Sequence, residues 1–175
     1  MNELFYVNTL INKPDREISD LSLLKSNVDD YFVQITNTNE VLDLESLLDF
    51  DYLNGAITLK YYEQVLLDVT LWDLVDQLWA YFLNVIESLL NTGEGETYFP
   101  DQPVKLHLKS ISEDLVLYKL EANVQIKAVL PKNEFIETML EGAYVFFRNM
   151  EECFNGRCNY QYELEKIETL RGIFL

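Results

Sequence analysis

Closely spaced carboxylates are the groups in this sequence best suited to chemistry. The candidate pairs are Asp29-Asp30, Asp43-x-Glu45, Asp49-x-Asp51 and Glu151-Glu152. Converging carboxylate oxygens bind hard cations such as Ca2+ or Mg2+, and two carboxyl groups serve as acid and base in glycosidases. No EF-hand calcium loop occurs, however, and among 30 acidic residues some close pairs arise by chance. We interpret these pairs as solvated surface charge, with a carboxylate-based, metal-dependent hydrolase as an alternative.

The histidine and cysteine content argues further against catalysis. His107, the single histidine, lies between Lys105 and Lys109 on the polar face of a predicted strand, where a surface role is expected. Cys153 and Cys158 flank a turn, where either a small-loop disulfide or two reduced thiols could exist. The start of the chain shows no secretion signal, which favours thiols and a cytoplasmic location. One histidine and two cysteines are poor zinc ligands, so we expect no metal and no cofactor.

Catalytic and phosphate-binding motifs are also missing from the sequence. It contains neither the G-x-x-x-x-G-K-S/T loop nor the G-x-G-x-x-G loop that cradle phosphates, and it has no G-x-S-x-G nucleophile turn. We therefore assign no catalytic residue and expect a protein that is not an enzyme.

Charge is distributed unevenly along the chain. The net charge is −17 although 49% of the residues are hydrophobic, which indicates a folded acidic protein rather than a disordered tail. Residues 1–103 contain 19 acidic and 4 basic residues, whereas residues 104–130 contain 3 acidic and 4 basic ones. Such a surface repels nucleic acids and anionic membranes, because both carry phosphate groups. A basic protein partner is the expected alternative, and the lysines of 104–130 give only thin support for nucleic-acid binding.

Aromatic residues among the acids suggest where such a partner binds. Trp79 is expected in the core, whereas Trp72 is a better interface candidate because Trp and Tyr are enriched as interface anchors. The predicted partner-binding residues are Asp29, Asp30, Asp49, Asp51, Tyr52, Trp72, Asp73 and Asp76.

Two long helices are predicted from apolar residues at three- and four-residue spacing. The first spans about 71–90, with Thr70 as its N-cap and a stop at Asn91-Thr92-Gly93. The second spans about 134–152 and ends at Asn155-Gly156. The tail, 160–171, fits a helix or a strand, and we favour a helix.

Strands are predicted from alternating residues over 4–8, 31–36 and 104–130. The unbroken alternation over 116–130 predicts one bent strand or two collinear ones rather than a hairpin. Asn54-Gly55 predicts a hairpin turn between strands over 50–53 and 56–62, and 93–103 an exposed loop. Residues 41–49 fit a short helix or a strand, and we favour a weak helix. Together these elements predict a single α+β domain over 1–175, with a mostly antiparallel sheet packed against two long helices. No apolar run approaches the length needed to span a bilayer.

The chain resembles the immunity proteins of bacterial contact-dependent and polymorphic toxin systems. The resemblance covers its size, its acidity and its layout, in which Trp72–Leu90 leads through Tyr98-Phe99-Pro100-Asp101 into the 104–130 sheet. It rests on no specific motif, so no functional residue is carried over. It implies a cytosolic protein that binds a basic toxin domain stoichiometrically. Besides the hydrolase, a DNA-mimicking inhibitor and an acidic adaptor remain alternatives.

Overall fold

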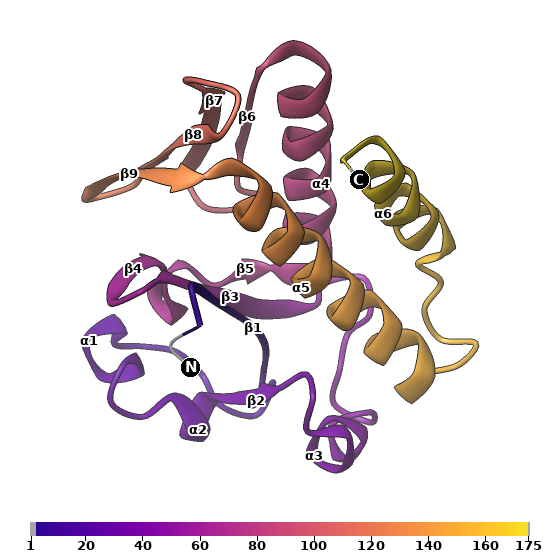
Figure 1. Ribbon diagram of the computed structural model, residues 1–175. Coiled ribbons are helices and arrows are strands. Elements are labelled where there is room, and N and C mark those ends of the chain that lie inside the picture. The colour runs from indigo at the N-terminus through magenta and orange to yellow at the C-terminus, as the bar shows by residue number, and fades with distance from the viewer. Residues whose placement is uncertain (1–2, 175) are drawn as a thin grey trace.

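Two antiparallel sheets and three long helices form the protein, according to a computed structural model that describes residues 3–174 (Figure 1). The predicted α+β class is confirmed. The prediction of one sheet and two long helices is wrong in number, because the chain forms a second sheet and the tail forms a third long helix.

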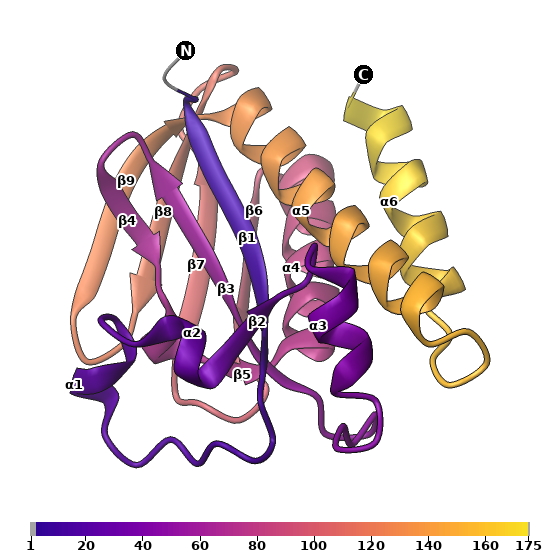
Figure 2. The same ribbon diagram turned by 90° about the horizontal axis from the view of Figure 1, so that it is seen from below.

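The first sheet has the order β2-β1-β3-β4, with β5 paired to β3. Its strands are β1 (Phe5–Asn12), β2 (Phe32–Gln34), β3 (Asn54–Tyr61), β4 (Gln64–Leu67) and β5 (Asp73–Leu74). Three short helices, α1 (Leu21–Leu24), α2 (Val28–Tyr31) and α3 (Thr38–Asp43), gather toward the end where β1 stops and β3 begins (Figure 2). The helix predicted over 41–49 is therefore shorter and begins earlier.

The predicted hairpin turn at Asn54-Gly55 is wrong, because both residues lie in β3. A Cβ on Gly55 would lie 2.3 Å from the Leu10 carbonyl oxygen, so this glycine permits close approach of β1. The turn instead occurs at Tyr62-Glu63, between the paired residues Tyr61 and Gln64, where Tyr62 has a φ of 49°.

The second sheet has the order β6-β7-β8-β9. Its strands are β6 (Glu94–Tyr98), β7 (Lys105–Ser110), β8 (Leu115–Glu121) and β9 (Gln125–Pro131). Two predictions fail here. Residues 94–98 form a strand rather than a loop, and β8 and β9 form a hairpin rather than one bent or two collinear strands.

The long helices are α4 (Val75–Thr92), α5 (Lys132–Cys153) and α6 (Gln161–Phe174). The second helix and the tail helix were predicted correctly, whereas the first begins four residues later than expected. Thr70 is not its N-cap: it lies in a 3-10 turn, η1 (Val69–Leu71), whose own cap is Asp68. Gly93, with a φ of 83°, ends α4 as predicted.

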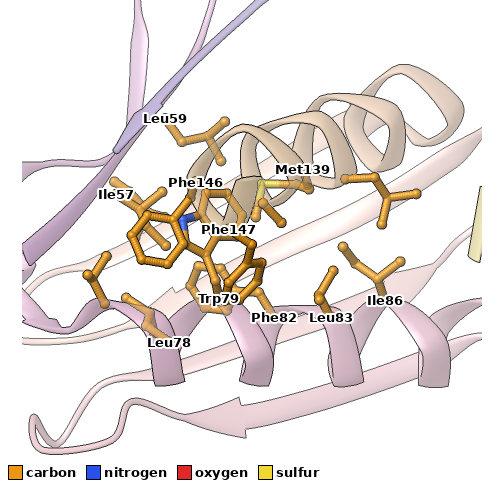
Figure 3. Packing of buried hydrophobic residues seen from close by; sticks show 14 of the residues in the cluster. Ile57, Leu59, Leu78, Trp79, Phe82, Leu83, Ile86, Met139, Phe146 and Phe147 are labelled. Atoms are coloured by element: carbon orange, nitrogen blue, oxygen red, sulfur yellow. The ribbon is translucent and has the colours of Figure 1, made fainter. Parts of the chain in front are cut away.

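The core lies where α4 and α5 meet the two sheets. Helix α4 contacts β3, β6 and β7, and α5 contacts β1, β8 and β9. Figure 3 shows the packing of Ile57 and Leu59 of β3 against Leu78 and Trp79 of α4 and Phe147 of α5. Trp79 is fully buried, as predicted, and its indole N–H donates a hydrogen bond to Thr9 Oγ1 at 3.0 Å. Between residues 3 and 174, no helix has the length and apolar character to cross a membrane.

Candidate partner-binding surface

The segment between the end of β1 and the start of β3, residues 13–53, forms what we call the acidic cap. It contains α1, α2, β2, α3 and their connecting loops. Its ten acidic and three basic residues give it a net charge of −7. Nine of the ten acidic side chains are exposed: Asp15, Glu17, Asp20, Asp29, Asp30, Glu40, Asp43, Asp49 and Asp51. The tenth, Glu45, is half-buried and lies 3.5 Å from Arg157.

Local hydrogen bonds fix the conformation of the acidic cap. Lys13 ties the first loop to α2, because its backbone N–H donates to the Tyr31 carbonyl at 2.8 Å and its ammonium to the Asp29 carbonyl at 2.7 Å. Asp20 caps α1 by accepting from the Ser22 hydroxyl and backbone N–H, and these bonds lower the pKa of Asp20. The carboxylates are therefore held on an ordered backbone.

Five of the eight predicted partner-binding residues lie in the acidic cap. Asp29 and Asp30 are exposed on α2, and Asp49 and Asp51 are exposed on the turn after α3. The side chain of Tyr52 beside them is 66% exposed. A hollow of about 270 Å³ is lined by Asp49, Tyr52 and the loop after β1, and Lys13 joins this loop to α2. The loop after β1 therefore lies near Asp49 and near the helix that carries Asp29 and Asp30.

The other three predicted residues lie outside residues 13–53, although Trp72 and Asp73 line a hollow of about 320 Å³ together with Ile18, Ser19 and Leu21 of the cap. Trp72 is half-buried and packs against the small apolar cluster beneath the cap. Asp73 is only 2% exposed and accepts hydrogen bonds from three backbone N–H groups. Asp76 is half-buried and accepts a hydrogen bond from the Tyr160 hydroxyl at 3.2 Å. Burial raises the pKa of Asp76, outweighing its hydrogen bonds.

Exposed leucines on the cap were missed by the sequence reasoning. Their exposed fractions are 49%, 47%, 40% and 47% for Leu21, Leu23, Leu42 and Leu47. Helix α1 has four residues and buries only Leu24, so its other leucines remain in solvent. The run Leu-Ser-Leu-Leu was the available signal, because so short a helix has room to bury only one face.

The lysines of the second sheet do not form an uninterrupted basic strip. Lys105, His107, Lys109, Lys119 and Lys127 occupy alternate positions on its outer face, but carboxylates lie between them. Ion pairs join Lys105 to Glu96 at 2.8 Å and Lys119 to Glu121 at 2.7 Å, and His107 Nε2 lies within hydrogen-bond distance of Glu94 Oε1 at 2.6 Å. His107 is half-buried within this network of surface charges rather than beside a nucleophile.

The described chain offers little for metal or thiol chemistry. Within residues 3–174, no three His, Cys, Asp or Glu side chains are grouped closely enough to hold a metal ion. Cys153 and Cys158 are free thiols. Burial and the nearby Glu151 carboxylate raise the pKa of Cys158 to about 11, so this thiol is protonated and poorly nucleophilic at neutral pH.

Comparisons with protein-family models, with curated proteins and with solved structures find no match to this chain. The functional argument therefore depends on the residues of the acidic cap.

Proposed function

We propose that this chain is a cytosolic, immunity-type protein that binds a basic toxin domain stoichiometrically through its acidic cap. The observation that carries the proposal is the set of nine exposed carboxylates in residues 13–53, interspersed with exposed leucines and Tyr52. A surface that combines negative charge with apolar anchors fits a basic protein better than it fits a small substrate.

The two kinds of side chain contribute to different steps of binding. The carboxylates attract a cationic surface from a distance and speed the encounter, with a strong dependence on salt. Once the surfaces meet, Tyr52 and the cap leucines lose contact with water and slow dissociation. A toxin whose nucleic-acid-binding surface is covered in this way can no longer reach its substrate, so inhibition requires no turnover.

The ordered backbone of the cap supports tight binding. Leu24, Phe32, Val41 and Leu44 of the cap are buried and anchor it to the rest of the protein. The Lys13 and Asp20 hydrogen bonds hold its loops. A surface that is already ordered loses less conformational entropy on association, which leaves more of the contact energy for affinity.

The test uses the protein encoded by the gene next to that of this chain, which the proposal expects to contain a basic toxin domain. Association would be measured by stopped-flow at about 50 and 300 mM NaCl, where screening differs strongly. The variant D29K/D30K reverses two exposed charges of the cap. The control variant, E113K/D114K, reverses two consecutive exposed charges on the turn between β7 and β8, outside the cap. We expect the cap variant to associate about tenfold more slowly at low salt and the control to change less than about twofold.

Two outcomes would overturn the proposal: no binding by the unmodified chain, or equal slowing by both variants. A rise of several degrees in the melting temperature on adding Mg2+, abolished in D49N/D51N, would instead indicate a metal site at these carboxylates. That result would favour the metal-dependent hydrolase over the toxin-binding protein.

A further inference from the structure

A second surface, at the opposite end of β1 from the acidic cap, has the form of a groove. It lies between the start of β1, helix α5 and the end of α6, and its volume is about 640 Å³. Figure 2 shows these three segments beside one another. The apolar residues lining the groove are Leu4, Phe5, Val7, Leu140 and Phe174.

Glutamates form the rim of this groove. Glu134, Glu137 and Glu141 lie at three- and four-residue spacing on α5, so they share one side of the helix, and Glu3 lines the groove from the β1 side. Among the described residues, the single basic one in the lining is Arg171, which bonds Glu141 at 2.7 Å and Glu168 at 2.9 Å. Glu3, Glu134 and Glu137 have no ion-pair partner within residues 3–174. The groove thus combines an apolar floor with three carboxylates that no cation of residues 3–174 neutralises.

This combination restricts what the groove can bind. A purely apolar ligand would cover carboxylates without offering them a counter-charge, which costs free energy. A nucleic acid or an anionic lipid would be repelled by the glutamates. A helix with leucine-like residues on one face and Lys or Arg on both flanks would fill the floor and pair with the rim at once.

We infer that the groove between β1, α5 and α6 binds a basic amphipathic helix of a protein partner. The inference does not rest on the toxin proposal. The groove and the acidic cap are separated by the length of β1, which for eight residues is about 23 Å.

The test uses a fluorescent synthetic peptide of leucine and lysine, about five helical turns long, with all leucines on one face. Binding to the full chain would be followed by fluorescence anisotropy. The variant E134K/E137K reverses two rim charges at three-residue spacing, and E40K/D43K reverses two exposed charges at the same spacing on α3. We expect the dissociation constant to rise about tenfold for the first and less than about twofold for the second.

A scrambled peptide of the same composition, with its leucines spread around the helix, tests the apolar floor separately. We expect it to bind about tenfold more weakly than the amphipathic peptide. Since Glu134 lies in the first turn of α5, E134Q/E137Q is included as a milder variant, and circular dichroism checks that each variant is folded. Equal weakening by the rim and α3 variants, or equal binding of the two peptides, would overturn the inference.

Discussion

The Asp73 carboxylate holds the loop before β7 onto the start of α4. It accepts hydrogen bonds from the backbone N–H groups of Leu74 at 2.7 Å, Asp101 at 3.0 Å and Gln102 at 2.9 Å. Replacement by alanine leaves these donors without their acceptor, so we expect Asp73→Ala to lower the free energy of unfolding by about 3 kcal/mol. Urea denaturation would measure it. Asp101→Ala, which removes an exposed side chain, should change stability by less than about 0.5 kcal/mol.

Asp76 should make stability depend on pH in the opposite sense to an ordinary surface carboxylate. Burial raises its pKa above the usual 3.8, so the folded state binds the proton more tightly than the unfolded state does. Its favourable contribution is complete below pH 3.8 and is lost as the pH rises through the raised value. Relative to Asp76→Asn, the wild type should therefore gain stability as the pH falls from 7 toward 4. Urea titrations of both proteins across this range would check it, and parallel stability curves would contradict it.

At the level of single residues, the sequence could identify acidic candidates but not their surroundings. In the sequence, the buried Asp73 and the exposed Asp49 each lie between two apolar residues, and Asp76 and Asp29 each follow a valine, so their neighbours do not distinguish them. What separates them is the path of distant segments: the 99–103 loop covers Asp73, and Tyr160 covers Asp76. Burial by residues tens of positions away leaves no local pattern, so the sequence alone did not distinguish Asp73 and Asp76 from the exposed aspartates of the cap.

Helix α5 offers a test of how closely the elements pack. A Cβ on Gly142 would lie 2.9 Å from the Trp79 ring and 3.0 Å from Val7, whereas one on Gly172 of α6 would meet nothing within 4 Å. Alanine normally stabilises a helix relative to glycine. We expect Gly172→Ala to raise the free energy of unfolding by about 0.5 kcal/mol. Gly142→Ala should instead lower it by about 2 kcal/mol, because overpacking outweighs helix propensity. Thermal unfolding of both variants would measure the difference, and stabilisation by both would contradict this view of the interface.

Close packing between elements also explains why some helices and strands were predicted correctly and others were not. The second long helix carries a continuous 3.6-residue pattern and was predicted within a few residues, whereas the pattern of the tail also fitted a strand and a helix was only favoured. Gly55 and Gly95 suggested a turn and a loop, but a Cβ on Gly95 would lie 2.6 Å from the Val85 carbonyl oxygen of α4. Both glycines allow another backbone to approach a strand. Glycine is required at these positions by contact with a segment distant in sequence, so the residues around each glycine do not indicate it.

The β8–β9 hairpin shows a different limit of pattern reading. Glu121 pairs with Gln125, so three residues separate the strands and every paired position differs by an even number. Directly paired residues share a face, so the even residues of both strands point to the core, and the alternation continues unbroken through the turn. Only a turn with an even number of residues would have reversed the phase, so unbroken alternation could not exclude a hairpin.

For the molecule as a whole, the net charge of −17 should make folding and binding respond to salt in opposite directions. Exposed ion pairs contribute little, so repulsion among the carboxylates is the larger effect in the folded state. Salt screens this repulsion, and we expect the melting temperature to rise by a few degrees between about 20 and 300 mM NaCl. Circular dichroism would measure it.

The matched variants extend this last prediction to the acidic cap. D29K/D30K and E113K/D114K change the net charge equally, so both should reduce the salt-dependent rise in melting temperature. Only D29K/D30K should also reduce the salt dependence of toxin association, because repulsion acts across the whole molecule whereas attraction acts where the partner docks. A melting temperature that fell with added salt would mean that ion pairs such as Lys105–Glu96 outweigh the repulsion. Equal effects of both variants on association would mean that the partner responds to the net charge of the protein and not to the cap.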